Sequence, residues 1–480
     1  MVEVVKQEKR VQQQRRPLFC ALKNHLQQEK VSFHVPGHKN GVNWPVDSYV
    51  KQALAMDQTE VTGLDYLHEA EGVLKESQEL LRDFYDSKQS YYLINGSTVG
   101  NLAMILGTVS KGDTVLVDRS CHQSVIHALE LAEAKPIFIT PTYQVEKKEA
   151  VGWDISHVHS AFKTTHQIKA LILTYPSYNG QAAELREIID YTHQKGAVVL
   201  VDEAHGAHFT LSSPFPASAL DQGADVVVQS AHKMLPALTQ TGYLHVGKHL
   251  PEQIHQQVAH YLHLLQSSSP SYLLMQSLEY ARYFLAQFTE EDLQQTLAYR
   301  NQWVELFRKS GLEFWQSDDP LKGRLHWPHH SGDQLSQVLE QQGLFPEKND
   351  HEAVLLTFPL LKHSEKSLET IADFHLPKEL PSEKVVNEKN FNYPVLTSLE
   401  MSYAEQKVAA VKKVSLAEAA GEIAAQNITP YPPGIPLVLK GQRILPVEID
   451  SLQTSLSRKH RIVGLDENKH ISIFTVKEFS

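Results

Sequence analysis

The sequence predicts an α/β protein whose sheet is mainly parallel and is covered by helices on both faces. Short valine-rich apolar runs, such as AVVLV (197–201) and ADVVV (224–228), have the length and composition of strands buried on both faces. From residue 91 these runs alternate with helical patterns, as expected for a parallel sheet. Polar residues follow the strands directly, and in an open α/β sheet that edge binds ligands.

Strand and helix patterns can be placed in chain order. The expected strands are Tyr91–Ile94, Thr114–Val117, Pro136–Ile139, Ala170–Tyr175, Val198–Val201, Val226–Val228 and, as an antiparallel edge, Tyr243–Val246. The expected helices are Pro17–Gln28, 73–84, one ending near Val109, Ser120–Ala134, 154–166, 184–195, 251–266 and the helical stretch 271–309.

The length of 480 residues fits one large α/β domain with a smaller one, or about three domain-sized units. We expect an N-terminal arm or segment over residues 1–60 and a large domain over 61–310. Residues 311–480 are expected to form a smaller α+β region, with a polar connection near 376–392 that divides it.

The net charge of −11, from 45 basic and 56 acidic residues, argues against broad binding to nucleic acid. Two cysteines are compatible with a reducing compartment. The N-terminus has no apolar signal segment, and no stretch approaches the roughly 18 apolar residues that span a bilayer. We therefore expect a cytoplasmic protein that contacts neither membrane nor nucleic acid.

Two residues at the predicted sheet edge suggest a chemistry. Asp202 and Lys233 follow successive strands, within the motifs DEAHGAH and SAHK. A lysine that forms a Schiff base with an aldehyde cofactor holds pyridoxal 5'-phosphate, and an acidic partner keeps the pyridinium nitrogen protonated. The pair therefore predicts a pyridoxal phosphate site. The alternative is a surface lysine and a helix-capping aspartate.

The motif NGSTVGN (95–101) follows a strand and opens a helix. Backbone N–H groups at a helix N-terminus, with the hydroxyls of Ser97 and Thr98, form an anion site suited to phosphate. A plain helix cap is the alternative. The glycine–lysine–Ser/Thr ending of a P-loop is absent, so DEAH (202–205) does not indicate a helicase.

Other strand ends carry polar residues that belong to the same edge. His122, in DRSCHQS, is placed either to lie flat on a cofactor ring or to cap a helix. Ser230 and His232 lie within reach of whatever Lys233 holds, and both are donors suited to phosphate or carboxylate. Five strand ends with polar residues on one edge are the strongest indication of a site.

Some motifs favour structural roles instead. In TYPSYNGQ (174–181) a turn is favoured over pocket-lining roles for Tyr175 or Asn179, and Cys121 favours packing over nucleophilic chemistry. The closest histidine groups, at 157/159, 205/208 and 329/330, lack a ligand spacing such as HExxH. No metal site is therefore predicted.

Together these motifs resemble those of the bacterial class-I ornithine/lysine/arginine decarboxylases, which are fold-type-I pyridoxal phosphate enzymes. The matching motifs, which span almost the whole chain, are FHVPGHKNG, TGLDYLHEAEG, NGSTVGN, RSCHQS, DEAHGAH, SAHK and YPPGIP (431–436). The resemblance implies an aspartate-aminotransferase-like large domain and decarboxylation of lysine, arginine or ornithine, as in polyamine biosynthesis. It also implies at least a homodimer, in the short form that lacks an N-terminal wing domain.

The resemblance assigns roles to the site residues. It implies that Lys233 holds the cofactor covalently, that Asp202 pairs with the pyridinium nitrogen and that His122 stacks on the ring. His205 is implied to lie beside the cofactor. The residues implied to hold the phosphate are Ser97, Thr98, Ser230 and His232.

Two departures from the family pattern bear on substrate choice. Tyr66 stands where the family often has a second aspartate, and Lys440-Gly441-Gln442 stands where Pro-Gly-Glu is usual. Both lie in segments expected to shape the substrate end. Candidates for binding the cationic side chain of the substrate are Asp65, Glu69 and Glu71.

The predicted reaction is loss of CO₂ from the bound amino acid, after which His122 or Lys233 returns a proton to Cα. One alternative is another fold-type-I enzyme, an aminotransferase or a lyase. Arg443 is the late arginine that suits an aminotransferase, which grips a substrate carboxylate. The other alternative is a non-catalytic protein that keeps the pyridoxal phosphate pocket for regulation.

Overall fold

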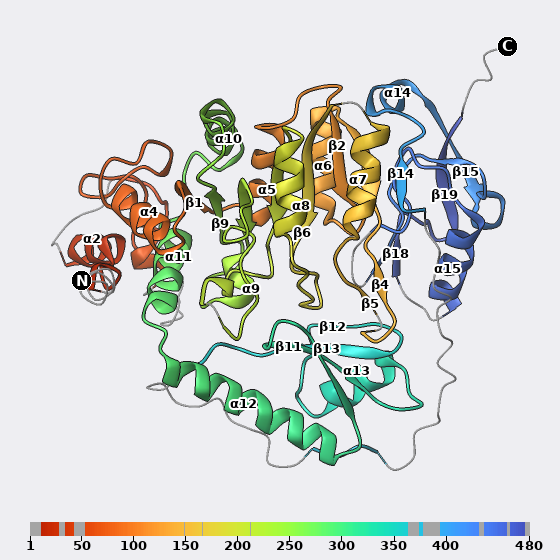
Figure 1. The fold of residues 1–480 in the computed structure, drawn as a ribbon. Coiled ribbons are helices and arrows are strands. Elements are labelled where there is room, and N and C mark those ends of the chain that lie inside the picture. Colours follow the sequence, from red (N-terminus) through yellow and green to blue (C-terminus); the bar gives the residue numbers. More distant parts are fainter. Residues whose placement is uncertain are drawn as a thin grey trace. The chain divides into compact units, whose positions relative to one another are not determined.

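The computed structural model describes residues 11–27, 34–42, 53–147, 149–165, 167–211, 213–362, 374–377, 394–431, 436–457 and 461–475. It divides into two compact units. The first comprises residues 1–107, 200–296 and 359–365, and the second 108–199, 297–358 and 366–480. Figure 1 labels the elements. Most of the predicted polar connection at 376–392 and of YPPGIP lies outside the described residues.

The first unit contains strands in the order β1-β9-β8-β7. β7 and β8 are parallel, whereas β9 is antiparallel to both β8 and β1. β1, β8 and β7 therefore run in one direction and end at one edge. The strands are β1 (Gln89–Leu93), β7 (Val198–Asp202), β8 (Val226–Gln229) and β9 (Gly242–Val246).

Figure 1 labels the helices of this unit, of which α4 and α5 contact β1. The helices are α2 (Pro17–Leu26), α4 (Val73–Phe84), α5 (Gly96–Leu106), α9 (Ala231–Met234), α10 (Glu252–Leu265) and α11 (Tyr272–Ala286). Two 3-10 turns are η1 (Leu67–Glu69) and η2 (Phe209–Leu211), and α12 (Glu290–Lys309) begins here and continues into the second unit.

Helix α5 lies close to β1 and β8 because a glycine faces them. A Cβ added at Gly100 would stand 2.7 Å from side-chain carbons of both Leu93 and Val228. On its other side α5 meets α10, where a Cβ added at Gly107 would stand 2.6 Å from the backbone nitrogen of Val258. The two glycines therefore set how closely α5 approaches the sheet and α10.

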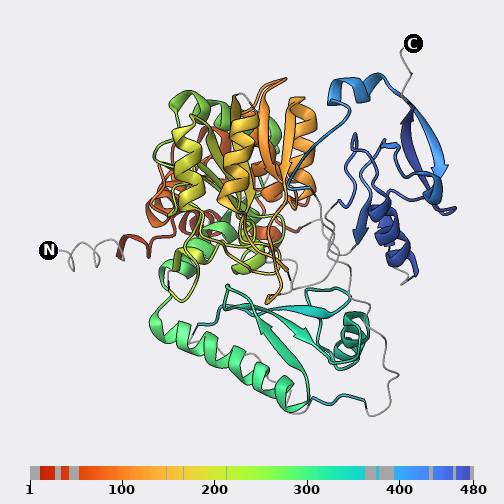
Figure 2. The same ribbon diagram turned by 45° about the vertical axis from the view of Figure 1, so that its right-hand side comes forward.

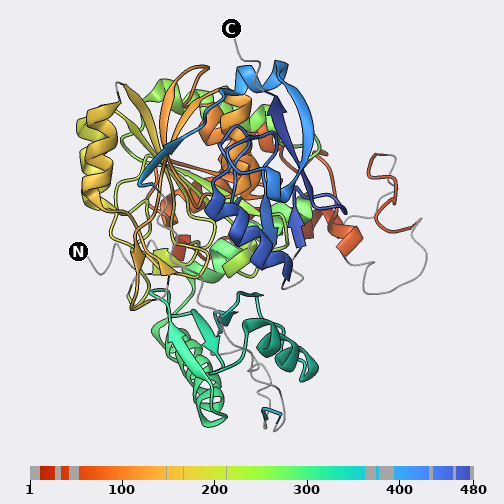
Figure 3. The same ribbon diagram turned by 90° about the vertical axis from the view of Figure 1, so that its right-hand side faces the viewer.

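The second unit contains strands in the order β6-β2-β3-β14, of which the first three are parallel and β14 is an antiparallel edge. Helices α7 and α8 lie side by side over one face (Figures 1 and 3). These elements are β2 (Thr114–Asp118), α6 (Gln123–Ala132), β3 (Lys135–Ile139), β4 (Tyr143–Gln144), β5 (Glu149–Ala150), α7 (Ile155–Thr164), β6 (Ile168–Thr174), α8 (Arg186–Gln194) and β14 (Leu396–Ser398).

Smaller sheets complete the second unit. One is antiparallel, with α13 against it (Figure 2); it contains β10 (Glu313–Gln316), β11 (Lys322–His326), α13 (Gly332–Gln341), β12 (Lys348–Asn349) and β13 (Ala353–Thr357). The C-terminal part has an aliphatic core of its own. Its elements are α14 (Tyr403–Val408), β15 (Ala410–Ser415), η3 (Leu416–Glu418), β16 (Ile423–Ala424), β17 (Thr429–Tyr431), α15 (Pro446–Ser457), β18 (Arg461–Val463) and β19 (His470–Thr475).

The predicted fold class is confirmed, because the central strands pair in parallel, β2 with β3 and β6, and β7 with β8, while helices accompany them and a smaller α+β portion follows. Two helix boundaries were wrong. The helix predicted from Ser120 begins at Gln123, because His122 is its N-cap, and the stretch 271–309 breaks near Thr289, where Thr289 and Asp292 cap a new helix. The predicted domain boundaries stay a prediction. Among the described residues, the helices are too short or too polar to cross a bilayer.

A buried carboxylate on α11 holds the N-terminal helix in place. Glu279 accepts hydrogen bonds from the backbone N–H groups of Leu18 and Phe19, at 2.9 and 2.8 Å, in the first turn of α2. It also accepts one from Ser77 of α4 at 2.8 Å. Burial raises the pKa of Glu279. A single side chain therefore satisfies the start of α2 and ties it to α4.

Removing this carboxylate is expected to destabilise the fold. Glu279→Ala leaves buried donors without an acceptor and should lower the free energy of unfolding by about 3 kcal/mol. Urea unfolding followed by circular dichroism measures the change. The exposed Glu467 provides the control variant Glu467→Ala, which should leave stability nearly unchanged. Equal effects of the two substitutions contradict the role of Glu279.

Candidate active site

One edge of the first unit brings together seven of the eight predicted site residues. The residues that end β7 or follow β1, β8 or β7 there are Ser97, Thr98, Ser230, His232, Lys233, Asp202 and His205. Because these three strands run in one direction, their carboxyl ends share an edge. The predicted clustering of strand-end residues is present for this part of the site.

Two hydrogen bonds tie the segment after β8 to its neighbours. The hydroxyl of Ser230, the buried N-cap of α9, donates to the hydroxyl of Ser97 at 2.7 Å. The Nζ atom of Lys233 lies 3.0 Å from Nε2 of His205. Lys233 is itself exposed in this chain. The start of α5, the start of α9 and the loop after β7 are therefore joined at the edge.

Asp202 is buried at the end of β7 and both of its oxygens are engaged. Oδ2 accepts from Nδ2 of Asn101 on α5 at 2.8 Å, and Oδ1 accepts from the backbone N–H of Ala204 at 3.1 Å. The carboxylate is therefore fixed in one orientation. The sequence motifs do not by themselves assign a role to Asn101. It stands one helical turn after Ser97, and that spacing could have indicated it.

The start of α5 has the form of an anion site and not of a side-chain cap. Its N-cap is Asn95, whose side chain makes no capping hydrogen bond and instead accepts from the backbone N–H of Ser267 at 3.1 Å. Ser97 and Thr98 lie inside the first turn, where N–H groups have no intrahelical acceptor. Gly96, with φ of +75°, makes the turn from β1 into α5.

The hydrogen bond of His232 fixes which ring nitrogen carries a proton. Nδ1 lies 2.8 Å from the backbone oxygen of Thr241, and since a carbonyl only accepts, Nδ1 is the donor. In the neutral ring Nε2 therefore carries a lone pair. Nε2 can donate a hydrogen bond only when the ring is cationic.

A buried polar network lies behind the edge. Glu203 accepts from Nε2 of Gln229 at 2.6 Å, while Oε1 of Gln229 lies 3.1 Å from Nε2 of His245. Nδ1 of His245 lies 2.7 Å from the hydroxyl of Ser90. Burial lowers the pKa of His245 to about 3, so its ring is neutral and donates to Gln229 from Nε2. The network holds the strand that precedes Lys233 against the residue that follows Asp202.

The charge of Glu203 is set by burial and by its donors. The backbone N–H of Ala219 and the hydroxyl of Ser218 donate to it at 2.7 and 3.0 Å, in addition to Gln229. Burial nevertheless dominates these hydrogen bonds and raises the pKa of Glu203 to about 8. The neutral acid therefore prevails at neutral pH.

His122, the eighth predicted residue, lies in the second unit. It is the N-cap of α6, where Nδ1 accepts from the backbone N–H of Ser124 at 3.2 Å. The proton of the neutral ring therefore sits on Nε2. The turn before it is held by Asp118, which accepts from the backbone and hydroxyl of Ser120, both at 2.9 Å, and whose pKa burial raises to about 6. Stacking of His122 on a cofactor stays a prediction.

Asp65, proposed from the sequence to bind the substrate side chain, has a structural role. Its carboxylate accepts from backbone N–H groups of Tyr66, Glu71, Gly72 and Leu74 at 2.8–3.1 Å. These hydrogen bonds fold the loop that precedes α4. The other two candidates, Glu69 and Glu71, are exposed in this chain. Tyr66 packs edge-on against the ring of His68.

The segment Lys440-Gly441-Gln442, which departs from the family pattern, makes structural contacts within the second unit. Oε1 of Gln442 lies 3.4 Å from the guanidinium of Arg119, and Nε2 of Gln442 donates to the buried Glu448 at 3.0 Å. A glutamate at 442 would place two carboxylates together. Lys440 pairs with Glu130 at 2.6 Å. The effect of these residues on substrate choice stays a prediction.

The turn predicted for TYPSYNGQ is confirmed, since the N–H of Ser177 donates to the oxygen of Gln181 at 2.9 Å. Among the described residues, no three histidine, cysteine or acidic side chains gather as a metal site would require.

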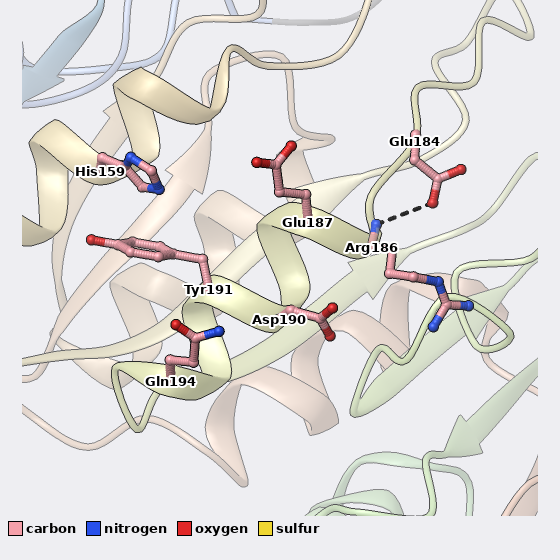
Figure 4. A pocket seen from close by; sticks show the side chains of 7 residues that line it. All are labelled: His159, Glu184, Arg186, Glu187, Asp190, Tyr191 and Gln194. Carbon is pink, nitrogen blue, oxygen red and sulfur yellow. Dashed lines mark hydrogen bonds between the residues drawn. The ribbon is translucent and has the colours of Figure 1, made fainter.

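Figure 4 shows a surface pocket of about 560 Å³ in the second unit. It is lined by His159, Glu184, Arg186, Glu187, Asp190, Tyr191 and Gln194, none of which the sequence singled out as a site residue.

The fold brings a lysine, a buried carboxylate and a helix N-terminus without a side-chain cap to one sheet edge. The model of the Orn/Lys/Arg decarboxylase major domain matches residues 16–334, and that of the C-terminal domain of the same family matches residues 385–468. The chain therefore belongs to the Orn/Lys/Arg decarboxylase family and is a decarboxylase. The resemblance stated from the motifs is confirmed.

Relatives support this assignment. The Bacillus subtilis (strain 168) protein YaaO, named as uncharacterized, is 40% identical over 93% of this chain and 96% of its own length. An arginine decarboxylase of the same organism is 27% identical over 96% of this chain and 98% of its own. The structure of lysine decarboxylase A from Pseudomonas aeruginosa superposes with a TM-score of 0.78 at 18% identity, covering 97% and 81% of the two chains, and shows the shared fold.

The raised pKa of Glu203 predicts how stability depends on pH. The folded protein holds this proton up to about pH 8, whereas the unfolded chain loses it near its ordinary value of about 4.3. The contribution of Glu203 is therefore present below that value and is lost as pH rises through about 8. In cofactor-free wild-type protein, the free energy of unfolding should therefore fall as the pH rises between these two pKa values. In the Glu203→Gln variant this fall should be smaller. Denaturant unfolding at several pH values tests this, and parallel curves for the two proteins contradict it.

Proposed function

We propose that this chain uses pyridoxal phosphate to decarboxylate a basic amino acid, releasing CO₂ and the corresponding amine. The observation that carries the proposal is the fixed, buried Asp202 at the same edge as the exposed amine of Lys233. Relatives named arginine decarboxylase and lysine decarboxylase support a basic substrate. Arginine is tested first, because the arginine decarboxylases are the more similar in sequence. A homodimer and a cytoplasmic location belong to the same proposal.

The residues present fit the three functional groups of pyridoxal phosphate. Lys233 offers an amine to the aldehyde, and Asp202 offers a carboxylate to the ring nitrogen. The uncapped first turn of α5, with Ser97 and Ser230 joined beside it, offers N–H and hydroxyl donors to the phosphate. The buried hydrogen bond from Asn101 keeps Asp202 oriented for a cationic partner.

Pyridoxal phosphate, when bound, supplies the electron sink for the electron pair that is left when CO₂ departs. Asp202, fixed by Asn101, would be the carboxylate that pairs with the ring nitrogen. His122 presents its ring proton on Nε2, because Nδ1 is occupied by the N–H of Ser124. We infer that this N–H returns a proton to Cα, with Lys233 Nζ as the second donor.

The contacts of Arg443 count against an aminotransferase. Its Nε donates to Glu400 at 2.8 Å and its NH1 to the backbone oxygen of Gly421 at 2.6 Å. Glu400 thereby neutralises the guanidinium that was the candidate for gripping a substrate carboxylate. The second alternative is a non-catalytic protein that binds pyridoxal phosphate. Such a protein would bind the cofactor but would turn over no amino acid.

The central test is a screen of arginine, lysine and ornithine for CO₂ release by the full chain with added pyridoxal phosphate. One of them should be turned over, and Lys233→Ala should lower kcat on the order of a thousandfold. The control Lys163→Ala changes an exposed lysine of α7 and should keep wild-type turnover. Cofactor binding without CO₂ release from any of them supports the non-catalytic alternative, and amino-group transfer supports an aminotransferase.

His232 predicts proton uptake when the cofactor binds. Because Nδ1 is committed to Thr241, the ring donates to a phosphate through Nε2 only as a cation. At slightly alkaline pH, binding to wild-type protein should therefore take up more protons per site than binding to His232→Asn. Calorimetry in two buffers of different ionisation enthalpy counts the protons. The exposed His260 supplies the control His260→Asn, and equal uptake in all three proteins rules out this role.

A further inference from the structure

We propose that His205 is a positioning residue that takes a proton from Lys233 Nζ and so frees the amine to react. The proposal rests on the proposed function, since the reaction partner of that amine is the cofactor aldehyde. Its basis is the contact of 3.0 Å between Lys233 Nζ and His205 Nε2. It adds a proton-handling role to a residue that the family resemblance places only beside the cofactor.

A hydrogen bond between two nitrogens needs one donor and one acceptor. An ammonium has three donors and no lone pair, whereas a neutral imidazole has one nitrogen of each kind. The contact therefore requires that Lys233 and His205 are not both cationic. With Lys233 as the ammonium, Nε2 of His205 is the acceptor and the proton of the neutral ring sits on Nδ1.

The proton transfer balances without a further reactant. The ammonium of Lys233 gives one proton to Nε2 of His205, which leaves a neutral amine with a lone pair and an imidazolium. Only the neutral amine attacks an aldehyde carbon. The imidazolium later returns the proton to Nζ when Lys233 is released again. His205 thus acts through Lys233 and not on the substrate.

The backbone around His205 is fixed, so the contact is not that of a loose surface side chain. His205 is 7% exposed. The backbone N–H of Glu203 donates to the backbone oxygen of Val228 in β8 at 2.7 Å, and the backbone N–H of Gly206 donates to the backbone oxygen of Glu203 at 3.0 Å. With the hydrogen bond from Ala204 to Asp202, these contacts hold the loop on both sides of His205. The imidazole is therefore preorganised beside the amine.

Other titratable groups on these elements have partners of their own. Asp202 is occupied by Asn101 and Ala204, and Glu203 by Gln229, Ser218 and Ala219. His232 on α9 donates to Thr241. The ring of the buried His208 packs against Phe209 and Phe215. Among the hydrogen bonds described for these groups, only that of His205 joins Lys233.

The experiment measures the reactivity of Lys233 in cofactor-free, full-length protein. Competitive labelling with an amine-directed reagent, read by mass spectrometry, gives the rate at Lys233 relative to the exposed Lys163 at several pH values. His205→Gln keeps a side-chain oxygen that accepts from the ammonium but takes no proton at neutral pH. We expect the relative rate at neutral pH to fall roughly tenfold in this variant, with a smaller difference in alkali, where the amine is already neutral.

Two controls separate this role from a loss of structure. His260→Gln removes an exposed histidine of α10 and should label as wild type. His205→Ala removes both the acceptor and the contact, and should react no faster than His205→Gln. Thermal unfolding of each protein confirms that the fold is retained. The rate at which added pyridoxal phosphate develops its bound absorbance band should follow the labelling rates.

The outcomes distinguish this proposal from the proposed function. Equal labelling of Lys233 in wild type and His205→Gln at every pH overturns the role of His205, even if the enzyme releases CO₂. A drop in labelling without CO₂ release from any basic amino acid supports the role of His205 and overturns the proposed substrate class. If His205→Gln alone is unfolded, the comparison with His205→Asn, which is shorter but likewise takes no proton, decides the matter.

Discussion

The hydrogen bond between Asn101 and Asp202 is the contact on which the candidate site depends. It places a buried carboxylate at the end of β7 and requires α5 to lie close to the sheet. That approach is set by Gly100, since a side chain there would strike β1 and β8. The same helix begins with the uncapped turn that contains Ser97. The position of this one helix therefore determines both the orientation of Asp202 and the location of the uncapped turn that contains Ser97.

Behind that contact, the edge is supported by polar groups and not only by apolar packing. In the chain from Ser90 through His245 and Gln229 to Glu203, each group has a hydrogen-bonding partner. Buried polar groups are costly when unpaired, so such a network tolerates one arrangement of its members and few others. It joins the segments that precede Lys233 and follow Asp202. Rigidity at these two positions is what a site that orients a flat cofactor requires.

The sequence was sufficient for the fold class and for residues that follow strands, because apolar runs and the polar residues after them are local patterns. It did not indicate the role of Asp65, whose backbone hydrogen bonds depend on how the loop folds. Asn101 and Glu203 were missed because their hydrogen-bonding partners are distant in sequence, although the spacing of Asn101 from Ser97 is a local signal. The start of α6 was misplaced because His122 itself is the cap. Tertiary contacts therefore decide the roles of Asn101 and Glu203, whereas local hydrogen bonds decide the loop at Asp65 and the start of α6.

The proposed function assigns reaction chemistry and substrate choice to different parts of this chain. In the proposed function, the amine, the acid and the first turn of α5 would act on groups that every α-amino acid or the cofactor shares, so they are compatible with any basic substrate. Relatives named arginine decarboxylase and lysine decarboxylase belong with this chain to one family. The carboxylate of Asp65 accepts hydrogen bonds from the backbone of its own loop, and the guanidinium of Arg443 donates to Glu400. Because these contacts already occupy both side chains, the site indicates the reaction more sharply than the substrate.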